Sequence, residues 1–79
     1  MTDHEFNRIN LLANRAAVDA ASAYRDLSPQ DYAILVDNQS ELLRATARAE
    51  GIRAAQVVNA CFVYHLARLN AVVVDTVNE

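Results

Sequence analysis

This chain of 79 residues contains almost nothing that interrupts a helix, because it has a single proline and a single glycine. Ser28 can cap a helix, Pro29 fits a first helical turn, and Asp31 favours the positive end of the helix dipole. Gly51 can adopt the left-handed conformation that often ends a helix. These two breaks predict three helices, near residues 3–27, 29–50 and 52–77.

The apolar residues of these segments recur at alternating steps of three and four, which is the spacing of a helix that buries one face. In the first segment this seam passes through Phe6, Ile9, Ala13, Ala16, Ala20, Ala23 and Leu27. In the second it passes through Tyr32, Leu35, Gln39, Leu42, Thr46 and Ala49.

We therefore expect an all-α fold of one domain over residues 1–79. Two arrangements fit: a small three-helix antiparallel bundle, or a helical hairpin with a long carboxy-terminal helix. The short turn at Gly51 leaves open whether the second and third helices form a hairpin or a corner. The β-branched run at residues 72–74 also leaves a short strand open as an alternative at that end of the chain.

The third segment is apolar around most of its circumference, and such a helix must be buried nearly all round. Two neighbouring helices each cover only one stripe of it. A homodimer would bury two such helices together, so we expect self-association. The dimer interface is expected to contain Val57, Cys61, Tyr64, His65, Arg68 and Val72.

Charge and cysteine content restrict the location and the partners. The net charge is −3, with seven basic residues, all arginine, against ten acidic ones, which disfavours nucleic acid as a partner.

Cys61 is the only cysteine, so no disulfide forms within the chain, and a lone thiol fits the reducing cytoplasm. The first residues lack the basic start and apolar run of a signal peptide. The most apolar region includes Asn59, His65 and Arg68, so no membrane span is expected.

Cys61 and His65 lie four residues apart and share one face of the predicted helix. A zinc site needs three or four protein ligands, and the other histidine, His4, is distant in the sequence. Catalysis by a Cys-His pair also needs an oriented base and an oxyanion site, which a bundle of hydrogen-bonded helices rarely offers. We expect no metal, no cofactor and no enzymatic activity.

Polar and aromatic residues of the first two helices are the candidates for binding a partner protein. Asparagines recur at helical spacing beside two arginines, and tyrosines combine apolar area with one hydrogen bond. The predicted partner-binding residues are Asn7, Arg8, Asn14, Arg15, Tyr24 and Tyr32.

The run Ala47-Arg48-Ala49-Glu50-Gly51-Ile52, followed by Val57, resembles the helix-turn-helix pattern of phage repressor-type DNA-binding domains. The alanine allows close helix contact, the glycine makes the turn and the aliphatic residues face the core. Glu50 departs from the pattern, which usually has a small or apolar residue there. The resemblance implies that a regulator using residues 44–60 would contact DNA through Arg44, Arg48, Arg53, Gln56 and Asn59.

The interpretation that fits best is a cytoplasmic, dimeric, helical protein that binds another protein. Small helical chains of this kind, including some encoded by phages and plasmids, are often accessory regulators or inhibitors that occlude a surface of their partner. The DNA-binding regulator and a structural subunit of a larger assembly are the alternatives.

Overall fold

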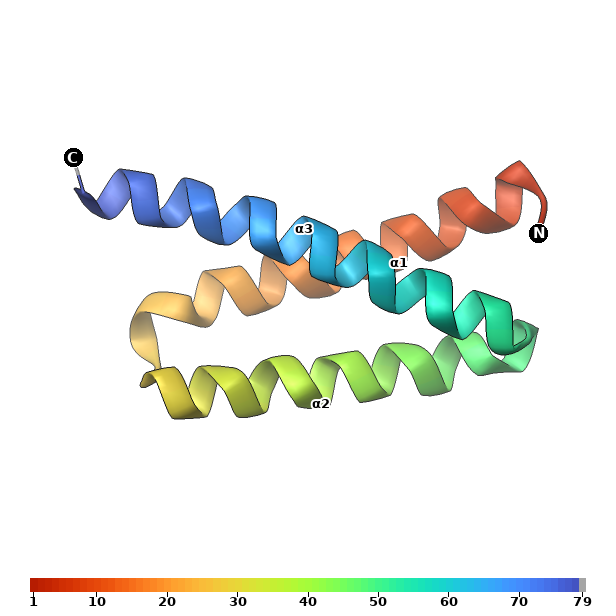
Figure 1. Ribbon diagram of the computed structural model, residues 1–79, viewed down its shortest axis with the longest axis horizontal. Coiled ribbons are helices and arrows are strands. Elements are labelled where there is room, and N and C mark those ends of the chain that lie inside the picture. The colour runs from red at the N-terminus through yellow and green to blue at the C-terminus, as the bar shows by residue number, and fades with distance from the viewer. Residues whose placement is uncertain (79) are drawn as a thin grey trace.

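The computed structural model describes the backbone of residues 1–78 and the side chains of residues 1–70. Three α-helices follow one another along the chain: α1 (Asp3–Ala23), α2 (Pro29–Ala47) and α3 (Ile52–Asn78). Two short 3₁₀ turns, η1 (Tyr24–Asp26) and η2 (Arg48–Glu50), close the first two helices (Figure 1). The all-α prediction is confirmed, and the alternative of a strand at residues 72–74 is wrong because α3 continues through them.

The side-chain caps at the starts of α1 and α2 follow ordinary helix-capping chemistry. The Ser28 hydroxyl accepts a hydrogen bond of 3.1 Å from the Asp31 amide, and Pro29 opens α2. The Thr2 hydroxyl accepts one of 3.1 Å from the Glu5 amide at the start of α1. These bonds satisfy amides that have no partner inside the helix. The predicted start of α2 is therefore confirmed.

Gly51 separates η2 from α3 with φ of 116° and ψ of 166°. Only glycine adopts this region readily, and a Cβ at this position would meet no atom within 4 Å. Any effect of a side chain here therefore comes from backbone strain and not from a clash.

We expect Gly51→Ala to lower the free energy of unfolding by about 1–3 kcal/mol. Urea denaturation of both proteins at equal chain concentration measures the difference. An unchanged free energy would show that the turn relaxes without strain.

The core lies mainly where α1 crosses α3 (Figure 1). Alanines on α1, such as Ala13 and Ala17, are fully buried and let the two backbones approach closely. Among the side chains that the structure describes, Val58 and Phe62 of α3 are the largest that are fully buried. The remaining buried residues of this core are Ile9, Ala16, Ala20, Leu43, Ala47, Ala54 and Leu66.

Two side-chain hydrogen bonds fix the direction of α3 relative to α2. The Ser40 hydroxyl donates to Oδ1 of Asn59, and the Asn70 amide donates to the Tyr32 hydroxyl at 2.6 Å. The later residue of α2 pairs with the earlier residue of α3, and the earlier residue of α2 with the later one of α3. The third helix therefore runs back along the second. These helices therefore meet as a hairpin and not as a corner.

The seam predicted for α2 is displaced by one residue at its carboxy-terminal end. Leu43 and Ala47 are buried, whereas Leu42 is 63% exposed.

Of the residues that the structure describes, no helical stretch combines the length and apolarity needed to cross a membrane.

Candidate interaction surface

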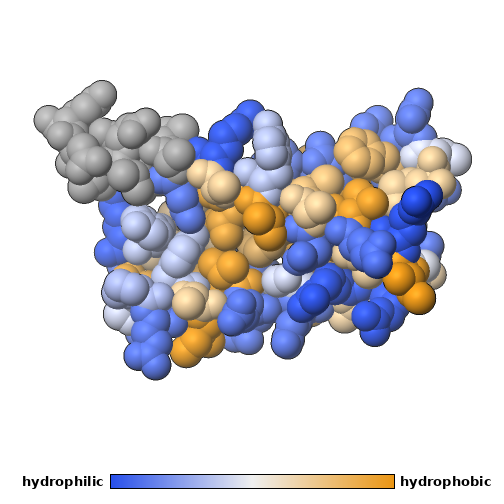
Figure 2. Space-filling view, viewed as in Figure 1, coloured by the Kyte–Doolittle hydropathy of each residue, from blue (hydrophilic) through white to orange (hydrophobic). Residues whose placement is uncertain are grey.

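A shallow groove runs along the line where the amino-terminal half of α1 meets the middle of α3. Its volume is about 390 Å³, and its lining is mostly apolar. We call it the α1–α3 groove; it is lined by Phe6, Asn10, Ala60, Cys61, Tyr64 and His65. In the space-filling view, hydrophobic surface gathers over the middle of α3 and the amino-terminal half of α1 (Figure 2).

Helical spacing places four residues on one flank of α3, beside the groove and at the border of the buried face of that helix. Val57, Cys61, Tyr64 and Arg68 follow one another at steps of four, three and four. Val57 and Cys61 are half-buried, while Arg68 and Tyr64 are exposed, Tyr64 to 62%. This flank therefore presents a stripe whose apolar residues are only partly covered by the core, and Tyr64 is the most exposed of them.

The polar groups of the groove are already oriented by hydrogen bonding. Nε2–H of His65 donates to Oδ1 of Asn10 across 2.8 Å, which ties α3 to α1. The ring of Tyr64 lies edge-on to that of His65, with centroids 5.4 Å apart. The floor of the groove is thus held in place by contacts between the two helices.

The predicted interface residues lie together as far as their side chains are described. His65 lines the groove, and Val57, Cys61, Tyr64 and Arg68 form the flank beside it. The side chain of Val72 lies outside the described ones. The groove gathers the predicted residues at one place, but pairing with a second copy stays a prediction.

Cys61 does not have the environment of a reactive cysteine. Burial raises the pKa of its thiol above the ordinary value, so the thiol stays protonated at neutral pH. A catalytic cysteine needs the opposite shift. Among the described residues, no group of three or more histidine, cysteine, aspartate or glutamate side chains is placed to hold a metal ion.

A second exposed apolar surface lies on the opposite flank of α1. Leu11 is 58% exposed, and Leu12 is exposed beside it. Arg8 and Arg15 lie one turn before and after this pair, and the four residues line a shallow depression. We call these residues the outer stripe. Arg8 also forms an ion pair with Glu50 of η2 at the protein surface.

The other predicted partner-binding residues are distributed over different parts of the molecule. Asn7 is exposed and Asn14 is half-buried on α1. Tyr24 and Tyr32 are half-buried at the turn between α1 and α2, with ring centroids 5.0 Å apart in an edge-to-face contact. They line a separate pocket with Arg25, Leu27 and Pro29.

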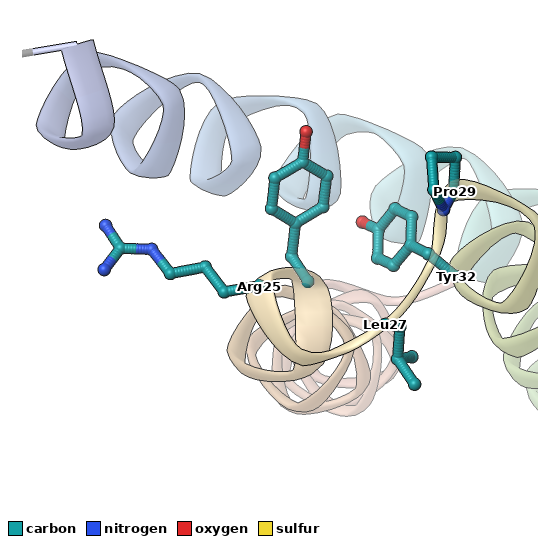
Figure 3. Close-up of a pocket in the computed structure, with 5 residues that line it drawn as sticks. Arg25, Leu27, Pro29 and Tyr32 are labelled. Carbon is teal, nitrogen blue, oxygen red and sulfur yellow. The ribbon is translucent and has the colours of Figure 1, made fainter.

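Figure 3 shows how the residues of this pocket point. The ring of Tyr32 lies below α3 in this view. The side chain of Arg25 extends to the left, away from Tyr32. The hydroxyl of Tyr32 accepts the hydrogen bond from Asn70. Tyr32 therefore serves the packing of α2 against α3.

The residues of the DNA-binding hypothesis lie along the hairpin. Arg44, Arg48, Arg53 and Gln56 are exposed, but Asn59 accepts the hydrogen bond from Ser40. The two helices of a helix-turn-helix cross at about 90–120°, so that the second projects into a groove. Here α3 returns along α2, and this geometry does not favour the DNA-binding hypothesis.

Sequence reasoning missed several residues of both surfaces. Phe6 was expected in the core but is 44% exposed and lines the α1–α3 groove. Leu11 and Leu12 are large apolar residues that lie outside the seam of α1. This position in the sequence pattern could have identified them as exposed. Ala60 carries no signal, because alanine is common on every face of these helices.

No protein-family model, curated protein or solved structure matches this chain.

Proposed function

We propose that this chain is a three-helix antiparallel bundle that pairs with a second copy of itself and binds another protein as an accessory regulator or inhibitor. The observation that carries the proposal is the exposure of large apolar side chains on both sides of α1, at the groove that it forms with α3 and on the outer stripe. Phe6 and Tyr64 are exposed at the α1–α3 groove, and Leu11 and Leu12 on the outer stripe. Contiguous apolar patches with polar rims are typical of protein-binding surfaces.

The two surfaces have different roles in this proposal. The α1–α3 groove is the self-association surface, because it contains the flank of α3 that the other helices leave only partly covered. The outer stripe is the partner-binding surface, where two arginines border an apolar centre. Arginine is enriched at such sites because it combines charge, several donors and an apolar stem.

The regulator acts by covering a surface of its partner, and the proposal assigns it no catalytic step and no cofactor. The raised pKa of the Cys61 thiol leaves this thiol unactivated as a nucleophile. An unpaired thiol also fits a cytoplasmic location.

The experiment compares proteins captured from the lysate of a host cell by immobilised wild-type chain and by Leu11→Arg. A partner that docks on the outer stripe should bind Leu11→Arg about 30-fold more weakly, because an interface anchor contributes about 2 kcal/mol. The matched control is Ala45→Arg, which adds the same charge at an exposed position of α2. Equal capture by all three proteins would contradict the assignment of the outer stripe.

A further inference from the structure

The residues along the partly covered flank of α3 change from small to large in one direction. Val57, Ala60 and Cys61 come first, and Tyr64, His65 and Arg68 follow. All of them lie on the flank or line the groove. A surface that is hollow at one end and raised at the other fits a second copy of itself when that copy is reversed.

Resting on the proposed self-association, we propose that two copies pair through antiparallel α3 helices, with the twofold axis between Cys61 and Tyr64. Each copy then places its Tyr64 in the α1–α3 groove of the other. The groove is incomplete in one chain, because its occupant is the tyrosine of the second chain.

With the axis in this place, each large residue of one copy lies opposite a small residue of the other copy. Tyr64 faces Cys61, His65 faces Ala60, and the stem of Arg68 packs along Val57. A tyrosine suits the groove because its ring covers apolar carbon while its hydroxyl reaches the polar side chains of Asn10 and His65. The identical contacts on both sides of the axis close the assembly at two copies.

Charge favours the reversed orientation over a parallel one. In a parallel pair Arg68 would face Arg68, and like charges directly opposed across helices are unfavourable. In the reversed pair Arg68 points toward the amino-terminal end of the other α1, whose first turn contains Asp3 and Glu5. The reversed pair therefore separates the two Arg68 side chains and brings each of them nearer to acidic residues of the other copy.

Cross-linking at single cysteines tests this register, because the chain has only Cys61. Two Cys61 residues would be offset by three residues along antiparallel helices, which is about 4.5 Å at the rise of an α-helix. Bismaleimidoethane, a short reagent that joins two thiols, should therefore link wild-type chains into a covalent dimer. The reaction is run at mildly alkaline pH because the thiol pKa is raised.

Two variants in a Cys61→Ser background serve as matched controls. Val57→Cys lies on the same flank, but the two introduced thiols would be offset along the helices by eleven residues, or about 16 Å. They should not be linked. Val63→Cys is exposed on the opposite flank of α3 and should not be linked either. Mass spectrometry of the singly modified chain shows that each thiol reacted, and circular dichroism shows that each variant is helical.

Each outcome decides between specific possibilities. Linking at Cys61 with none at positions 57 and 63 supports the proposal. Linking at both 57 and 61 means parallel helices, and linking at 63 means another face; either overturns it. A dimer in sedimentation with no Cys61 link overturns the register but leaves self-association standing, whereas a monomer overturns both.

Discussion

Replacing Phe62 with alanine is expected to lower the free energy of unfolding by about 3–5 kcal/mol. Phe62 is fully buried where α1 crosses α3, and its neighbours in the core include alanines that are too small to fill the space it leaves. A small domain has a total stability of about 5–15 kcal/mol, so the variant should be largely unfolded under mild denaturing conditions. Chemical denaturation followed by circular dichroism measures the loss.

The chain supplies a matched control for this substitution, because it has a second phenylalanine. Phe6 is 44% exposed, so Phe6→Ala removes the same atoms from a site that buries far fewer of them. We expect it to lower the free energy of unfolding of the single chain much less, when both variants are measured at a chain concentration too low for the proposed self-association to contribute. If both variants lose the same stability, the core is not where the structure places it.

The second large effect concerns self-association, which Tyr64→Arg should weaken by about 30-fold or more. Tyr64 is exposed in one chain and becomes the buried anchor of the proposed dimer. Removing such an anchor costs about 2 kcal/mol, and an arginine in its place adds a charge that the apolar groove would have to bury. Sedimentation velocity over a dilution series measures the dissociation constant.

Val63→Arg is the control for this charge. Val63 is 55% exposed, adjoins Tyr64 in the sequence and points to the opposite flank of α3. It should leave both helicity and self-association unchanged. Equal weakening by the two substitutions would indicate a general effect of charge and would contradict the role of the groove.

The helices and their boundaries follow closely from local sequence. Ser28 and Pro29 start α2 through the expected cap, and Gly51 has the positive φ that ends a helical segment. The predicted first helix nevertheless stops early at Ala23. Ser28 is extended because the residue that precedes a proline avoids the helical region, and Leu27 before it is extended as well.

The packing of the helices depends on contacts that local sequence does not encode. Gly51 permits either a hairpin or a corner, and the hydrogen bonds of Ser40 with Asn59 and of Tyr32 with Asn70 accompany the hairpin. Leu42 and Leu43 are equally apolar neighbours, so only the positions of α1 and α3 determine that Leu43 is the buried one.

The candidate site was partly predictable for the same reason. The excess of apolar residues on the third helix identified the flank with Cys61 and Tyr64. The contribution of α1 was missed, because Phe6 follows the heptad spacing of core residues but lies beyond the place where α1 and α3 cross. The sequence pattern cannot specify where two helices diverge.

Sedimentation equilibrium of the wild-type chain tests the central claim, that a second copy covers the exposed flank of α3. One chain has a mass of 8.7 kDa. We predict twice that mass at low micromolar concentration. A mass of one chain at every concentration that can be reached would contradict the account.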